Sequence, residues 1–122
     1  MNMTISTRNV GGIAILDLSG RIVLGEESAA LRDMICDLLS QGHTQILLNL
    51  GGVEYIDSMG LGSLVGAFAT VKKQGGDLKL CNLPEKVADV MQITKLYTVF
   101  DILSDEAAGL KAFAQSKAAA KS

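Results

Sequence analysis

Two short segments at the start of the chain carry aliphatic or β-branched residues at period two, which is typical of β-strands. They span residues 3–8 and 13–18, and the pair Gly11 and Gly12 between them indicates a tight turn. We therefore expect the chain to open with an antiparallel hairpin.

Beyond Gly20 and a short apolar stretch at residues 22–24, hydrophobic residues follow a helical spacing in several segments. Glu26 and Glu27 suit the first turn of one helix, and Pro84 suits the first position of another. Aliphatic runs between these segments are typical of strands that are covered on both faces. The pattern predicts helices over residues 26–39, 57–73, 84–91 and 106–113, and strands over residues 46–50 and 78–83.

Strands and helices alternate from residue 13 onward, an order that predicts an α/β fold with helices packed against a mixed sheet. No internal repeat and no change in composition marks a second domain. We therefore expect one domain over residues 1–113. Residues 114–122 are small and polar, and we expect them to form a frayed, disordered tail.

The composition agrees with one globular domain that folds without a metal ion or a disulfide. The chain has 122 residues, of which 48% are hydrophobic and 20% are charged, and its net charge is -2. A domain of this size buries roughly two thirds of the surface that its unfolded chain exposes. Basic residues are scattered along the chain and aromatic residues are few, which argues against a nucleic-acid partner.

The cysteines and the N-terminal residues indicate the cellular compartment in which the protein is expected. Cys36 and Cys81 lie inside apolar runs, so we expect both to be reduced core residues. The first ten residues lack the apolar segment of a secretory signal, and no apolar run reaches the roughly 20 residues of a membrane span. These features predict a cytoplasmic protein that does not insert into a membrane.

One segment, residues 55–62, combines a carboxylate, a hydroxyl and two glycines where a strand is expected to turn into a helix. Asp57 is suited to cap the helix, which places the Ser58 hydroxyl outward in the first turn. Gly60 and Gly62 leave the surface beside it bare, although a glycine costs roughly 1 kcal/mol inside a helix. The segment is either a purely structural helix start or a site that a partner's backbone or a phosphate can approach.

No catalytic constellation is complete in this sequence. A nucleophile elbow needs a glycine two residues before its serine, where this chain has Ile56, and the single histidine, His43, is expected in a solvated turn. The glycines at positions 60, 62 and 66 miss the dinucleotide-binding spacing by one residue, and no phosphate-binding Gly-Lys-Ser follows. One histidine and two apolar cysteines do not make a metal site. A small enzyme acting through the serine is therefore the weakest interpretation.

The sequence Asp-Ser-Met-Gly-Leu-Gly at residues 57–62, preceded by Asn49, Leu50 and Tyr55, resembles the signature of the STAS domain. This domain is found in the bacterial anti-sigma factor antagonists. The resemblance covers nearly the whole chain, from the opening hairpin to the helix that begins near Pro84. It implies a single STAS-type domain with a mixed sheet, an opening antiparallel hairpin and about four helices packed mainly on one side.

The resemblance also implies a function and a site. Ser58 corresponds to a phosphoacceptor serine whose environment and helix cap are Asp57 and Gly60. Proteins similar to this one sequester an anti-sigma factor that is also a serine kinase, release it when phosphorylated, and are reset by a PP2C-type phosphatase. ATP and magnesium then belong to the kinase, so we expect no cofactor and no enzymatic activity in this chain. The implied partner interface comprises Met59, Leu61, Gly62, Arg21, Val23 and Leu24.

This chain departs from the family pattern at two places, and the first supports a different interpretation. Many members carry an acidic residue shortly after the glycine that ends the second strand, whereas residues 20–24 of this chain have none, unless Glu26 or Glu27 substitutes. Met59 stands where a small residue is more usual, and methionine suits adaptable protein interfaces. A STAS adaptor subunit of a signalling or transport assembly, in which Ser58 is never phosphorylated, is the alternative.

Overall fold

The computed structural model describes residues 4–22 and 26–121 of the chain. Strands and helices alternate along most of this length, as the hydrophobic pattern predicts. In chain order the elements are β1 (Thr4–Val10), β2 (Ile13–Ile22), α1 (Glu26–Ser40), β3 (Gln45–Ile56), α2 (Ser58–Lys73), β4 (Asp77–Cys81), α3 (Glu85–Thr94), the 3-10 turn η1 (Leu96–Thr98), β5 (Asp101–Leu103) and α4 (Glu106–Lys121).

The strands form one five-stranded sheet in the order β1-β2-β3-β4-β5. The pair β1 and β2 is antiparallel, and every other neighbouring pair is parallel. Gly11 and Gly12 connect the hairpin with positive φ angles of 59° and 84°, as tight hairpin turns require. The predicted α/β class, the mixed sheet and the opening hairpin are therefore confirmed.

Most of the hydrophobic core lies between the sheet and the helices α1 and α2, which contact each other. Alternate residues of the central strands point into this core, and buried residues of α3 join it. Its buried side chains include Leu16, Leu18, Leu48, Leu50, Leu31, Ile35, Leu64, Val87 and Met91.

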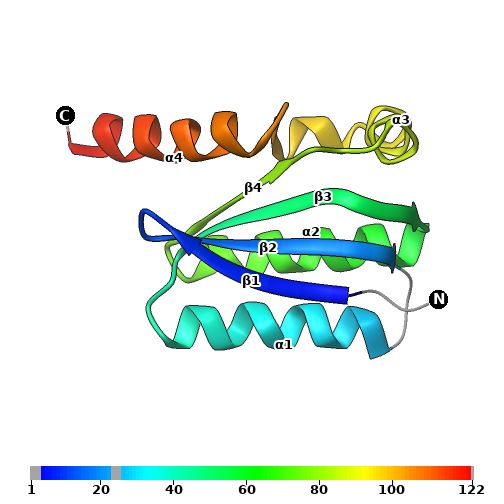
Figure 1. Ribbon diagram of the computed structural model, residues 1–122, viewed down its shortest axis with the longest axis horizontal. Helices are drawn as coiled ribbons and strands as arrows, with labels where there is room; N and C mark the ends of the chain where they lie inside the picture. The colour runs from blue at the N-terminus through cyan, green and yellow to red at the C-terminus, as the bar shows by residue number, and fades with distance from the viewer. Residues whose placement is uncertain (1–3, 23–25, 122) are drawn as a thin grey trace.

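The opposite face of the sheet is covered by α4, which Figure 1 shows on the side away from α1. Phe113 of α4 is 1% exposed and packs with Ile15, Leu47 and Cys81 in a second, smaller core cluster. Gly109 permits this approach, because a Cβ atom there would lie 2.8 Å from a side-chain carbon of Leu47. Three helices therefore contribute to the main core, and α4 covers the second face.

Several boundaries differ from the sequence-based prediction. The strands β2 and β3 run past Gly20 and Leu50 because irregular pairing lets both continue through their glycines. The strand β5 was not predicted, since only three residues pair with β4. The last helix continues to Lys121, so the structure describes a helix over most of the segment where we predicted a frayed tail.

The prediction for Cys36 is wrong, whereas that for Cys81 is confirmed. Both are free thiols, but Cys36 is exposed and Cys81 is fully buried. The core stripe of α1 contains Leu31 and Ile35, and Cys36 is turned about 100° from Ile35 around the helix axis, toward solvent.

Candidate functional site

The helix α2 begins at Ser58, and Asp57 caps it. The Asp57 backbone is extended, and its Oδ1 atom accepts a hydrogen bond of 2.7 Å from the backbone N–H of Gly60. The next N–H group, that of Leu61, donates to the Asp57 carbonyl oxygen at 2.8 Å. Ser58 therefore lies in the first turn and is exposed, as the sequence predicts.

Gly60 places the start of this helix in close contact with the end of β2. The backbone N–H of Asp57 donates to the carbonyl oxygen of Ile22 at 3.3 Å, and a Cβ atom on Gly60 would overlap that same oxygen. Only a residue without a side chain fits there. The position of Ser58 is thus set by contact between α2 and β2.

Gly62 has a different environment. It is exposed, and a Cβ atom there would meet nothing within 4 Å. Because Gly62 has no side chain, the outer surface of α2 has a depression beside Met59, where another molecule's backbone can approach closely. The two glycines of the motif therefore have different roles: Gly60 permits the close contact with β2, and Gly62 leaves space at the surface.

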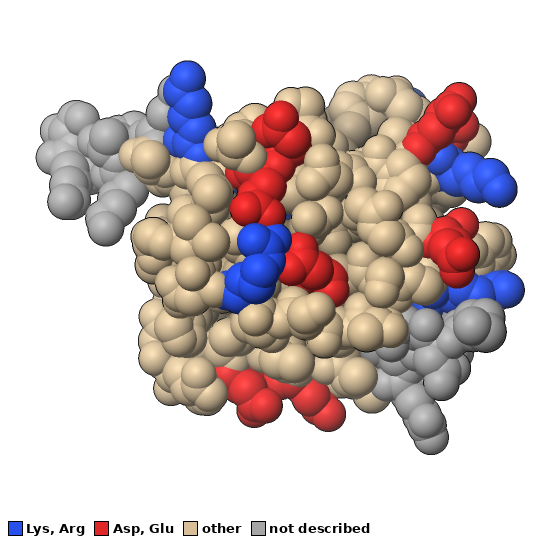
Figure 2. All heavy atoms as spheres, in the orientation of Figure 1, with Lys and Arg blue, Asp and Glu red and all other residues tan. Residues whose placement is uncertain are grey.

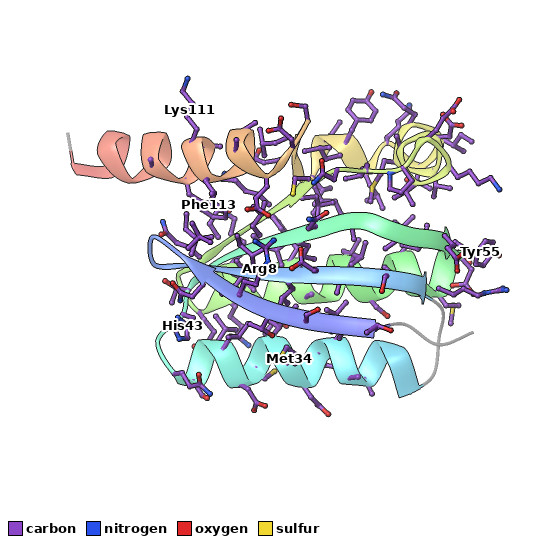
Figure 3. All side chains as sticks on the ribbon, viewed as in Figure 1. Arg8, Met34, His43, Tyr55, Lys111 and Phe113 are labelled. Carbon is purple, nitrogen blue, oxygen red and sulfur yellow. The ribbon has the colours of Figure 1, made fainter. Side chains whose placement is uncertain are left out.

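Two large apolar side chains close to the serine in sequence, those of Tyr55 and Met59, are exposed. Tyr55 is 45% exposed and Met59 is 53% exposed. The guanidinium carbon of Arg21 lies 4.7 Å from the centre of the Tyr55 ring, and the two residues are paired between β2 and β3. Figure 3 shows Tyr55 at the end of the sheet where α2 begins. Exposed aromatic and methionine side chains of this kind are enriched at protein interfaces.

A shallow groove continues from this patch along α2 toward α1. Its volume is about 380 Å³, and small residues of α2 form much of its lining. The exposed Arg32 of α1 lies on its other side. The residues that line it are Arg32, Met59, Gly62, Ser63, Gly66, Ala67 and Thr70.

The structure brings together most of the residues proposed for the site. Arg21, Met59 and Gly62 are exposed beside Ser58, but Leu61 is 5% exposed and packs in the core, because its position on α2 faces the sheet. Leu61 is therefore removed from the interface. Val23 and Leu24 lie outside the described residues.

Tyr55 is a further exposed residue of this patch, which the sequence indicated only as part of the signature. Val53 and Ile56 are both buried. A strict alternation counted from Val53 would bury Tyr55 as well, so alternation along β3 does not predict that Tyr55 is exposed. A large aromatic residue two positions before the capping aspartate was the available signal.

Other features of the described chain bear on metal binding and on membrane insertion. No cluster of three His, Cys, Asp or Glu residues within residues 4–22 and 26–121 could hold a metal ion. His43 lies half-buried in the connection between α1 and β3, where its backbone N–H donates to Leu38. None of the helices in these same ranges is long and apolar enough to span a membrane.

Comparisons with known proteins agree with this architecture. Residues 4–109 match the family model described as the STAS domain. The chain is 34% identical over 111 residues to the anti-sigma-B factor antagonist of Bacillus subtilis, covering 91% of this chain and 100% of that protein.

Solved structures show the same fold. The crystal structure of the Thermotoga maritima protein tm1081 matches with a TM-score of 0.81 and 26% identity, covering 88% of this chain and 92% of that one. The Bacillus cell fate determinant SpoIIAA in its phosphorylated form matches with a TM-score of 0.68 and 21% identity, covering 89% of this chain and 99% of that one. With the capped serine at the start of α2 and a family match over nearly the whole domain, the chain belongs to the STAS domain family.

Proposed function

We propose that this protein is an anti-sigma factor antagonist whose binding to its partner is switched by phosphorylation of Ser58. The observation that carries the proposal is the exposed Ser58 at the first position of α2, beside the exposed Tyr55 and Met59. The similarity to the Bacillus subtilis anti-sigma-B factor antagonist supports the class of partner.

The unphosphorylated surface is suited to bind a protein. Met59 supplies a flexible apolar contact, the Arg21 and Tyr55 pair supplies a rigid amphipathic one, and Gly62 leaves room for close approach. The groove along α2 extends this surface without a break, since Met59 and Gly62 also line it. Val23 and Leu24 stay in the proposed interface on the basis of the sequence alone.

A phosphate on Ser58 would oppose binding at this surface. It adds about -1.5 to -2 charges at pH 7, directly beside the Asp57 carboxylate and the apolar Met59. The N-terminus of α2 offers roughly 0.3–2 kcal/mol of compensation, whereas a thousandfold loss of affinity requires about 4 kcal/mol. Desolvation of an unpaired phosphate against a close-packed partner is of sufficient size, several kcal/mol. Phosphorylation therefore releases the partner unless that partner presents its own arginine cluster.

The chemistry of the switch belongs to other proteins. We propose that the anti-sigma factor is itself the serine kinase and holds ATP, and that a PP2C-type phosphatase restores the free hydroxyl. The role of this chain is to present Ser58 in a fixed position, through the Asp57 cap and the Gly60 contact with Ile22. The protein then acts as a binding module in the cytoplasm and not as an enzyme.

The proposal is tested first on the endogenous protein, by intact-mass measurement and phosphosite mapping of the free and the partner-bound pools. We expect one phosphoryl group on Ser58 in the free pool, and none in the pool that is bound to an anti-sigma factor. A stable partner that is retained while Ser58 stays unmodified under growth and stress would contradict the switch and favour the adaptor.

The second test is calorimetry with the captured anti-sigma factor. Ser58→Asp should weaken binding, and Ser58→Ala should bind but resist phosphorylation. Ser40→Asp is the matched control, because it adds the same charge at another exposed serine, the last residue of α1. Equal affinities for Ser58→Asp and Ser40→Asp would show that charge at Ser58 does not control binding.

A further inference from the structure

The strand β1 forms one edge of the sheet, and its outer side is open. The sheet ends at β1 on one side and at β5 on the other, and β1 has seven residues whereas β5 has three. No strand within residues 4–22 and 26–121 pairs with the outer side of β1. Figure 1 shows β1 in front of the other strands, with α1 below and α4 above it and no helix drawn across it. A long open edge of this kind is a template for pairing with another chain.

This edge lacks the features that usually protect an exposed strand. Its pairing with β2 is regular from Thr4 to Val10, without a bulge, and the strand contains no proline and no lysine. Its single charged residue, Arg8, donates to the carboxylates of Asp17 and Glu106 on the face of the sheet that α4 covers. Figure 2 shows this blue group between red ones near the middle of the visible face. The charge of Arg8 is therefore neutralised and does not repel a second strand.

The hairpin turn fixes which backbone groups of β1 point outward. Gly11 and Gly12 both have positive φ, and they join Val10 to Ile13, which lie opposite each other. In a two-residue hairpin this closing pair is hydrogen-bonded, and such pairs then alternate with non-bonded ones along the strands. The N–H and C=O groups of Val10 and of every second residue before it therefore point toward β2. The residues whose backbone groups point outward are Ile5, Thr7 and Asn9.

The outward groups are arranged symmetrically about Thr7, so the edge is complementary to itself. When two β1 strands run antiparallel with Thr7 opposite Thr7 of a second copy, every residue from Thr4 to Val10 has a partner. Ile5 then lies opposite Asn9, and each outward N–H group meets an outward C=O group. The β-branched side chains of Thr4 and Val10 also lie opposite each other, a pairing that favours sheets. A twofold axis at any other residue of β1 leaves part of the strand without a partner.

The side chains permit this pairing on both faces of the sheet. On the face that α4 covers, Arg8 lies opposite Ser6 of the second copy, so no like charges lie directly opposite each other. On the other face, the Thr7 hydroxyl donates to the Met34 sulfur at 3.6 Å, which brings a flexible apolar side chain from each copy close to the axis. The helix α1 packs against β2 and α2, so it lies behind the edge and leaves it accessible.

We propose that this protein forms a dimer in which β1 pairs with β1 of a second copy about a twofold axis at Thr7, so that the two sheets become one. A single pair of seven-residue strands is smaller than a standard protein interface, so the dimer is weak. Because the pairing is antiparallel, β3 points in opposite directions in the two copies, and the two Ser58 surfaces lie at opposite ends of the dimer. Dimer formation therefore does not depend on the phosphorylation of Ser58, and one dimer can hold two partner molecules.

Sedimentation equilibrium of the full chain between about 20 µM and about 1 mM tests for the dimer, because weak complexes dissociate in this range. We expect the mean mass to rise with concentration toward twice the mass of one chain. A concentrated sample that mixes ¹³C-labelled and unlabelled chains then tests the register by NMR. The Hα protons of Ser6 and of Arg8 in different copies should be in contact, because this non-hydrogen-bonded pair has its Cα atoms about 4.5 Å apart. The mass of a single chain at every concentration, or a dimer without this contact, would overturn the proposal.

Two variants at the axis test the pairing. Thr7→Pro removes an outward N–H group and leaves the hydrogen bonds to β2 in place, which an edge strand tolerates. Thr7→Lys keeps the backbone and sets two like charges opposite each other. Since each loss occurs twice at the axis, we expect both to raise the dissociation constant of the dimer by about tenfold or more.

Thr98→Lys is the matched control, because it adds the same charge at an exposed threonine of η1, which contacts β5 at the opposite edge of the sheet. It should leave the dissociation constant unchanged. Circular dichroism reports whether each variant folds. Dimers of unchanged stability in folded Thr7→Pro and Thr7→Lys, or equal weakening by Thr98→Lys, would contradict the proposal.

Discussion

Gly60 at the start of α2 lies directly against the carbonyl oxygen of Ile22 at the end of β2, with no space for a side chain between them. The neighbouring backbone hydrogen bond from Asp57 to Ile22 joins the same two elements. Through this contact the exposed Ser58 is held at a fixed place relative to Arg21, the residue that precedes Ile22. The site is thus rigid at its base and open at its surface.

This contact predicts opposite effects of alanine at the two glycines of the motif. Gly60→Ala should lower the free energy of unfolding by about 1–3 kcal/mol, because the backbone must move to relieve the overlap with Ile22. Gly62→Ala should raise it by up to about 1 kcal/mol, because alanine favours the helix and its methyl group meets open space. Chemical denaturation of both variants checks this, and equal stabilities would show that the Gly60 contact is not tight.

The second prediction concerns how α4 is held on the sheet. Phe113→Ala should destabilise the protein by about 3–5 kcal/mol, because the ring is fully buried and the cavity cannot close completely. Lys111→Ala is the matched control, since Figure 3 shows its side chain pointing away from the sheet on the same helix. Thermal unfolding followed by circular dichroism distinguishes them. A Phe113→Ala variant as stable as Lys111→Ala would mean that α4 contributes little to the fold.

The two thiols should differ in reactivity. Cys36 is exposed on α1, whereas Cys81 is fully buried and burial raises the pKa of its thiol to about 11. Only the thiolate reacts, so a disulfide reagent at pH 8 should modify Cys36 quickly and Cys81 only when the protein unfolds. Counting modified thiols against time tests this, with Cys36→Ser as the control. A fast reaction in Cys36→Ser would show that the second cluster opens in the native state.

The fourth prediction concerns acid. The hydrogen bonds from Arg8 hold the pKa of Asp17 below its usual range, although partial burial opposes this. A carboxyl group with a lowered pKa in the folded state stabilises the protein above its unfolded pKa of about 4, and this stabilisation is lost as the pH falls through the folded value. Asp17→Asn should therefore unfold with a weaker pH dependence below about pH 4.

Asp33→Asn serves as the control for the acid experiment, because Asp33 is exposed on α1. Unfolding midpoints in urea, measured between neutral and strongly acidic pH, give the comparison. If the native protein and Asp17→Asn lose stability in parallel as the pH falls, the Arg8 contact does not contribute to acid stability.

The sequence by itself determined the class of fold, the opening hairpin and the position of the capped serine. These features depend on local chemistry: the aliphatic and β-branched residues of β2, the turn at Gly11 and Gly12, and the short-range hydrogen bond between Asp57 and Gly60. Such interactions join residues that are close in the chain, so residue type and spacing are sufficient to predict them.

Only the tertiary structure decided which side chains reach solvent and which distant residues meet. Cys36 was predicted in the core and is exposed, whereas Leu61 was predicted at the partner interface and is buried. The rotation of each helix relative to the sheet, which is set by packing, determines which of its positions are covered. The strand β5 forms because β4 supplies a parallel neighbour, and the side chain of Asn82 donates a hydrogen bond of 3.2 Å to that of Asn49 although 33 positions separate them. These contacts join residues far apart in the chain, and their free energy depends on the assembled core that no local pattern contains.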